Sequence, residues 1–163
     1  MSTLTLAANT ITPLQALDQW APIVWLKTNL YAYPMLEVMH IVGIALVFGT
    51  LWIVDLRLLL RINALNKLDA QALAKALLPW TIIGFLLAAM TGLTMFVSRI
   101  GDLISNPAFI IKISLLFTAG TNAAILHARG ALNAENMLTR IQAGLSILIW
   151  LAVITCGRWI AYV

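Results

Sequence analysis

Four ionisable side chains lie inside long apolar stretches of this chain, namely Glu37, His40, Lys112 and Arg158. A charged group at the centre of a bilayer costs roughly 2.5–3.5 kcal/mol even on insertion scales, so such groups usually face a bundle interior, a cavity or a ligand. Imidazole nitrogen is a common iron ligand, and guanidinium groups bind carboxylates. These residues therefore predict a polar site within a membrane-embedded protein.

The surrounding elements follow from composition. The 163 residues are 62% hydrophobic and 10% charged, whereas soluble domains carry about 25% charged residues. A membrane-spanning helix needs about 20 mostly apolar residues. Four stretches meet this length, at 33–60, 78–97, 107–127 and 141–162, and prolines stand near the start of the first three. The sequence predicts an all-α fold, a four-helix transmembrane bundle over residues 33–163.

Residues 1–32 are expected to form an N-terminal interfacial segment. Trp20, Trp25, Tyr31 and Tyr33 have the composition of an aromatic belt at a membrane surface, and Pro22 is expected to break any helix there. A second surface helix is predicted between the first two spans, over 62–73, with its lysines in water.

Basic residues predict the orientation of the chain. Arg57, Arg61, Lys67 and Lys75 lie at or near the connection between spans one and two, and Arg129 and Arg140 flank that between spans three and four. Cytoplasmic loops carry an excess of lysine and arginine. We expect a multi-pass protein of the bacterial inner membrane with both termini in the periplasm. The loop lysines and arginines that set this orientation also account for the net charge of +4, so the charge does not predict a nucleic-acid partner.

Helical rise places several polar residues at one depth. At 1.5 Å per residue, His40 lies about 22 Å above Asp55, and Lys112 lies about 25 Å above Arg129. Arg158 reaches a similar level on the fourth span, Glu37 lies one turn above His40, and Arg99 closes the second span. The pattern predicts one site in the outer part of the bundle.

His127 lies at another depth, about 19 Å from the level of His40. Two axial nitrogens must both lie within a few ångströms of one haem iron, so His40 and His127 of one chain are excluded as a pair. Across a dimer, His40 could still meet its own copy. The two histidines and Cys156 are too dispersed for a structural zinc site.

Each site residue has more than one interpretation. His40 could bind iron, or hydrogen-bond to Glu37 or a hydroxyl. Lys112 could pair with Glu37, extend towards the membrane surface, anchor an acidic ligand, or bind iron as a neutral amine opposite His40. Arg158 and Arg99 could bind carboxylates such as haem propionates, or interact with the membrane edge. Small residues on the second span, at Gly84, Ala88 and Gly92, favour close helix packing.

Three segments carry a family resemblance: YPMLEVMHIVGIALVFGTLWIVDLRLL, IIKISLLFTAGTNAAILHAR and GRWIAYV. They resemble an uncharacterised family of small four-helix bacterial membrane proteins. The first span and the lysine that opens the third are also distantly similar to the membrane haem-containing protoporphyrinogen oxidases (HemJ type). That resemblance implies haem b at His40 and a functional role for Lys112. The copper-resistance D-type membrane proteins share a similar first span.

The leading hypothesis is a haem b-binding membrane redox or electron-transfer protein, with His40 as axial ligand. Lys112 would be the second ligand or an anchor, Arg158 and Arg99 would bind propionates, and Glu37 would tune the local charge. Activity as an oxidoreductase, porphyrinogen oxidase-like or quinone-linked, is compatible with this site, as are a homo-oligomer and a redox partner protein. The alternative is a non-catalytic membrane subunit or lipid- or anion-binding module whose buried charges only fix helix packing.

Overall fold

The computed structural model describes residues 19–60, 69–129 and 136–163, and these ranges contain six helices and no strand. Two helices are short, α2 (Ala21–Thr28) and α6 (Ile100–Leu103). The other four are long and apolar enough to cross a membrane: α3 (Ala32–Leu59), α5 (Ala70–Ser98), α7 (Pro107–Ala128) and α8 (Met137–Trp159). The predicted all-α fold with four spans is confirmed, and the chain is a multi-pass membrane protein.

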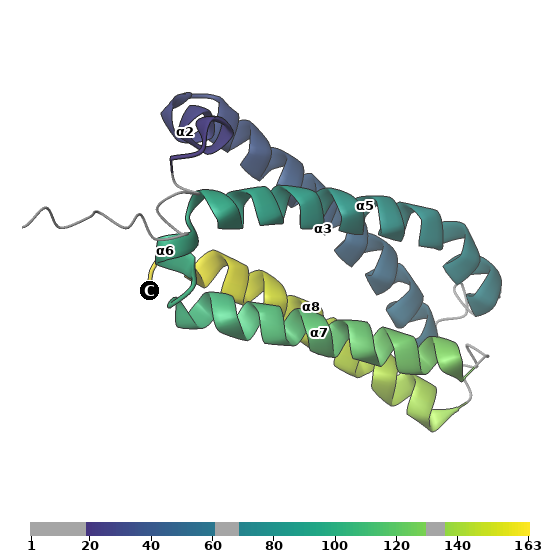
Figure 1. Ribbon diagram of the computed structural model, residues 1–163. Coiled ribbons are helices and arrows are strands. Elements are labelled where there is room, and N and C mark those ends of the chain that lie inside the picture. Colours follow the sequence, from purple (N-terminus) through teal and green to yellow (C-terminus); the bar gives the residue numbers. More distant parts are fainter. Residues whose placement is uncertain (1–18, 61–68, 130–135) are drawn as a thin grey trace, which may run out of the picture.

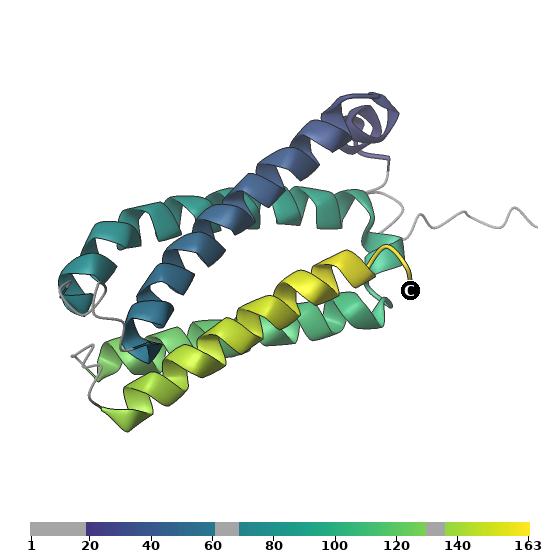
Figure 2. The ribbon, with the colours of Figure 1, turned by 180° about the vertical axis from the view of Figure 1, so that it is seen from behind.

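The four spans form two helical hairpins (Figures 1 and 2). Helix α3 packs along α5, α7 packs along α8, and the hairpins meet mainly through α3 and α8. At one end of the bundle α3 and α7 begin while α5 and α8 finish, and because α6 lies there we call it the α6 end. A direct contact between α5 and α7 occurs at this end, where the Phe96 and Phe109 rings stack with centroids 5.1 Å apart.

Polar side chains define where three of the spans begin. The Asp69 carboxylate accepts from the backbone N–H groups of Gln71 and Ala72 at the start of α5. Asn106 and Asn136 do the same for α7 and α8. The first N–H groups of a helix have no partner within it, and such capping supplies one.

Helix α5 begins earlier than the sequence pattern predicts. It starts at Ala70 rather than near residue 78, so Pro79 lies inside the helix instead of opening it. About two and a half turns of helix lie between the cap at Asp69 and the proline, and the whole helix has 29 residues. The predicted surface helix over 62–73 is therefore wrong for residues 70–73, which belong to α5, while 61–68 lie outside the described residues.

Helix α2 corrects the expectation for Pro22, which begins a helix rather than breaking one. Proline at a first-turn position has no intrahelical N–H bond to lose. Ile23 and Leu26 are buried, whereas Trp20 and Trp25 are exposed. The helix contacts both α3 and α5, so its apolar face rests on the first hairpin while its tryptophans face outward.

Two small apolar clusters bind the spans together. Leu58, Ala70 and Ala143 join α3, α5 and α8 at the end opposite α6. Ala119, Ile149 and Val153 join α7 to α8. Large apolar side chains elsewhere face outward, as expected where lipid tails rather than water surround the helices. Close contact between small residues therefore stabilises the packing of the spans more than a large apolar core does.

Candidate functional site

His40 lies in the interface between α3 and α5, half-buried, about 12 Å along α3 from the α6 end. Its ring Nδ1 is 3.0 Å from the hydroxyl oxygen of Thr91 on α5. A Cβ atom built on Gly92 would lie only 2.8 Å from the imidazole Cε1. The ring therefore packs flush against the backbone of α5.

The crossing of α3 and α5 directly below His40 is as tight as backbones allow. A Cβ atom on Gly43 would lie 2.7 Å from the Ala88 nitrogen and 2.9 Å from the Gly84 oxygen. A Cβ atom on Gly84 would lie 2.9 Å from the Gly43 oxygen. The small-residue stripe of Gly84, Ala88 and Gly92 thus packs against α3, and its last member accommodates the imidazole.

Lys112 comes from the other hairpin and extends towards α8. Its Nζ would be 3.4 Å from a Cβ atom built on Gly157, so the absence of a side chain there gives it room. The amine also lies within electrostatic range of Cys156 and of the His40 imidazole. That the His40 imidazole and the Lys112 amine share one level of the bundle stays a prediction from helical rise.

Glu37 does not pair with Lys112 as one interpretation of the sequence required. Its side chain is exposed, and within the described ranges its carboxylate forms no ion pair with that amine. It remains within electrostatic range of His40, one turn away on the same helix. Glu37 therefore contributes negative charge to the edge of the site rather than a buried salt bridge.

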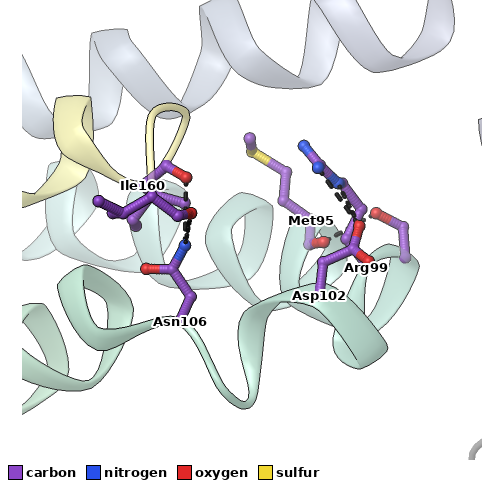
Figure 3. A network of polar contacts seen from close by, with 7 residues as sticks. Met95, Arg99, Asp102, Asn106 and Ile160 are labelled. Atoms are coloured by element: carbon purple, nitrogen blue, oxygen red, sulfur yellow. Dashed lines mark hydrogen bonds and ion pairs between the residues drawn. The ribbon is translucent and has the colours of Figure 1, made fainter.

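The two arginines lie at the α6 end with their charged heads exposed. The Arg99 guanidinium donates to Asp102 at 3.3 Å, as Figure 3 shows. The pKa of Arg99 is raised, mainly by a hydrogen bond to the Tyr33 side chain and also by the one to Asp102. The guanidinium group is therefore charged. Arg158 donates to the hydroxyl of Tyr162 and its guanidinium carbon is 4.9 Å from that ring centre. Both cations sit where an anionic group at the membrane surface could reach them.

His127 and Asp55 lie towards the opposite end. His127 is exposed in the last turn of α7, about 22 Å along that helix from Lys112. Asp55 is only 5% exposed and hydrogen-bonds to Ser146 across the α3–α8 contact. The exclusion of a pair formed by His40 and His127 of one chain is consistent with these positions. Asp55 therefore forms a polar contact between α3 and α8.

Asn106 ties the two helices of the second hairpin together at the α6 end. Its Oδ1 accepts from the Phe109 N–H, while its Nδ2 donates to the carbonyls of Ile160, at 3.2 Å, and Val163, at 2.7 Å (Figure 3). The side chain is 8% exposed, and every hydrogen-bonding direction of its amide nitrogen is used. It thereby fixes the start of α7, five residues before Lys112.

We expect Asn106→Ala to lower the free energy of unfolding by about 3 kcal/mol, because it removes a cap and two buried hydrogen bonds. Asn136→Ala is the matched control, since this exposed cap of α8 bonds only to the Leu138 N–H among the described contacts. It should cost about 1 kcal/mol. Unfolding in detergent, followed by loss of helicity, measures both. Equal losses would show that the bonds to Ile160 and Val163 contribute nothing.

Sequence reasoning missed Thr91, Gly92 and Cys156 as neighbours of the site. Thr91 and Gly92 lie 51 and 52 residues after His40 and belong to a span whose stripe indicated packing alone. The sequence signal that could have indicated this contact was the position of Thr91 directly before Gly92, the last glycine of the small-residue stripe. Cys156, next to Gly157, carried no spacing that pointed to Lys112.

The fold and the site define a class of protein: a small four-span membrane bundle with an imidazole and an amine from different hairpins near one end. A family profile, the family of unknown function DUF6644, matches residues 25–163, and the chain belongs to that family. No curated protein and no solved structure matches the chain. The expected membership of an uncharacterised family is confirmed, whereas no comparison links the chain to the oxidase or copper-resistance families.

Proposed function

We propose that this protein binds haem b within the membrane and serves electron transfer, with His40 as the axial ligand. One observation carries the proposal: the α3–α5 interface holds the His40 imidazole against Gly92, with its Nδ1 3.0 Å from the Thr91 hydroxyl oxygen. Ionisable groups such as this imidazole and the Lys112 amine are costly inside a membrane unless they face a ligand, a cavity or a polar partner. The Glu37 pairing that would have explained the amine is not formed between these described residues.

The donor set fits this cofactor. Haem iron accepts a neutral imidazole nitrogen, and His40 has one ring nitrogen, Nδ1, already engaged with Thr91. Histidine ligands of metals almost always use their second nitrogen in this way. A bound haem b would supply one-electron redox chemistry. The chain supplies the ligand nitrogen, the tight α3–α5 backbone contact beneath it, and the charges around it.

Lys112 is proposed as an anchor for an acidic group rather than as an iron ligand. Its amine has a flexible four-carbon stem and, as an ammonium, is a point charge suited to a carboxylate. Arg99 and Arg158 are proposed to bind the haem propionates at the membrane surface, since their heads are exposed at the α6 end. Glu37, exposed one turn above His40, would tune the local charge.

The distant resemblance to haem-containing membrane oxidases supports the same assignment at His40 and Lys112. The bias of lysine and arginine supports a bacterial inner membrane location with the α6 end on the periplasmic side. The chemistry of the donor set is equally compatible with electron transfer to a quinone or to a partner protein. Haem binding is the common requirement of these functions and is therefore what must be tested first.

The deciding experiment is the absorbance spectrum of protein purified in detergent after expression with a haem precursor. We expect a Soret band and, on reduction, sharp bands typical of haem b. A colourless protein, with no band after haem is added back, would contradict the proposal. The site would then be a packing device of a non-catalytic membrane subunit, the alternative that the sequence left open.

Lys112→Ala and Lys112→Arg separate anchoring from iron ligation. If the amine holds a carboxylate, arginine preserves the charge, and the Soret maximum and haem retention should stay as in the parent protein. Alanine should lower haem retention roughly tenfold, the typical order for losing an outer partner of a metal site. Dialysis against apomyoglobin measures retention. A changed spin state in Lys112→Arg would identify the amine as the second iron ligand instead.

A further inference from the structure

The hydroxyl of Thr91 already has an acceptor for its single proton. Its Oγ1 lies 2.6 Å from the backbone carbonyl oxygen of Leu87 and 3.3 Å from that of Ala88, both on its own helix. A contact of 2.6 Å between two oxygens is repulsive unless a proton lies between them. The proton therefore points at α5, and the oxygen presents a lone pair to His40.

The orientation of this hydroxyl determines the protonation of the imidazole. With an acceptor 3.0 Å away, Nδ1 of His40 must be the ring nitrogen that carries hydrogen. In the neutral ring the remaining nitrogen, Nε2, then keeps its lone pair.

We propose that Thr91 is a positioning residue that holds His40 in the Nδ1–H tautomer, so that Nε2 is the nitrogen offered to a metal. Gly92 assists, because its missing side chain lets the imidazole lie against the α5 backbone. The identity of the metal as haem iron rests on the proposed function. The tautomer itself does not, and it can be measured in protein that holds no haem.

Nitrogen-15 NMR of haem-free protein, labelled at histidine and reconstituted in lipid, tests the tautomer. The chain has two histidines, so a His127→Gln background leaves His40 as the only signal. At about pH 8.5, above the ordinary titration range of histidine, we expect a protonated Nδ1 and an unprotonated Nε2. Thr91→Val, which keeps the shape and removes the oxygen, should give a mixture of tautomers. Thr91→Ser should restore the parent spectrum.

A dominant Nε2–H tautomer in the parent protein would overturn the inference, whatever the protein binds. A Thr91→Val spectrum identical to that of the parent would overturn it equally, because the hydroxyl would then not be what selects the tautomer. Size-exclusion profiles of the variants show whether each is folded. Thr91→Ser, which retains the acceptor, separates the effect of the oxygen from that of any change in packing.

The haem arm of the experiment distinguishes the two proposals. Loss of an outer hydrogen-bond partner of a metal ligand typically lowers affinity 10- to 100-fold. We expect Thr91→Val to weaken haem binding by roughly this factor, with Thr91→Ser close to the parent. The expected tautomer in a parent protein that binds no haem contradicts the proposed function alone. Haem binding with equal affinity in Thr91→Val contradicts the role of Thr91 alone.

Discussion

Protein carrying His40→Ala is expected to show no Soret band, with haem affinity lowered by more than about 100-fold. This exceeds the 10- to 100-fold typical of losing an outer partner, because the iron ligand itself is removed. Alanine leaves the methyl group and opens the space beside Gly92 that the imidazole fills. Absorbance spectra of parent and variant, purified side by side in detergent, measure the effect.

Three controls accompany the His40 variant. His127→Ala removes the other histidine, which is exposed at the far end of α7, and should leave the band unchanged. Free imidazole added to His40→Ala should restore part of the band, since the ligand nitrogen can enter the vacated space. Circular dichroism establishes that the variant is folded. A full-strength band in folded His40→Ala would show that another residue binds the iron.

The four spans could be predicted because lipid imposes a length and an apolar composition on every helix that crosses it. The residues at which the helices begin and end could be predicted less well. A proline is compatible with the start of a helix but does not require one. Pro79 lies inside α5 because the Asp69 cap begins the helix about two turns before the predicted start. Asp69, Asn106 and Asn136 gave a better signal, since each offers a side-chain oxygen to otherwise unpartnered N–H groups.

The shared depth of the site residues stays a prediction, drawn from helical rise, which converts sequence position into height. Which side of each helix faces its neighbour could not be predicted. The sequence allowed Glu37 to pair with Lys112, yet Glu37 is exposed while Lys112 reaches towards Gly157. Apolar surface on all sides of a span removes the amphipathic signal that orients helices in water. The neighbours of His40 are therefore a product of tertiary packing alone.

The crossing below His40 should be the position least tolerant of added volume. In Gly43→Ala the new methyl group would meet the backbone nitrogen of Ala88 and the backbone oxygen of Gly84, at 2.7 and 2.9 Å. Backbone atoms cannot rotate aside as the end of a side chain can, so α3 must move away from α5. Such overpacking costs about 1–3 kcal/mol. The loss of helicity on heating in detergent measures it.

Gly49→Ala on the same helix provides the matched control. A Cβ atom there meets nothing within 4 Å, so stability should stay at or slightly above that of the parent, because alanine is the better helix former. The crossing also links fold to site, since His40 lies one turn from Gly43 and depends on the same approach of α3 to Thr91. Gly43→Ala should therefore also weaken haem binding, whereas Gly49→Ala should not. Equal stability in the two variants would show that the α3–α5 contact is looser than these distances require. It would also contradict the inference that this contact positions His40 beside Thr91.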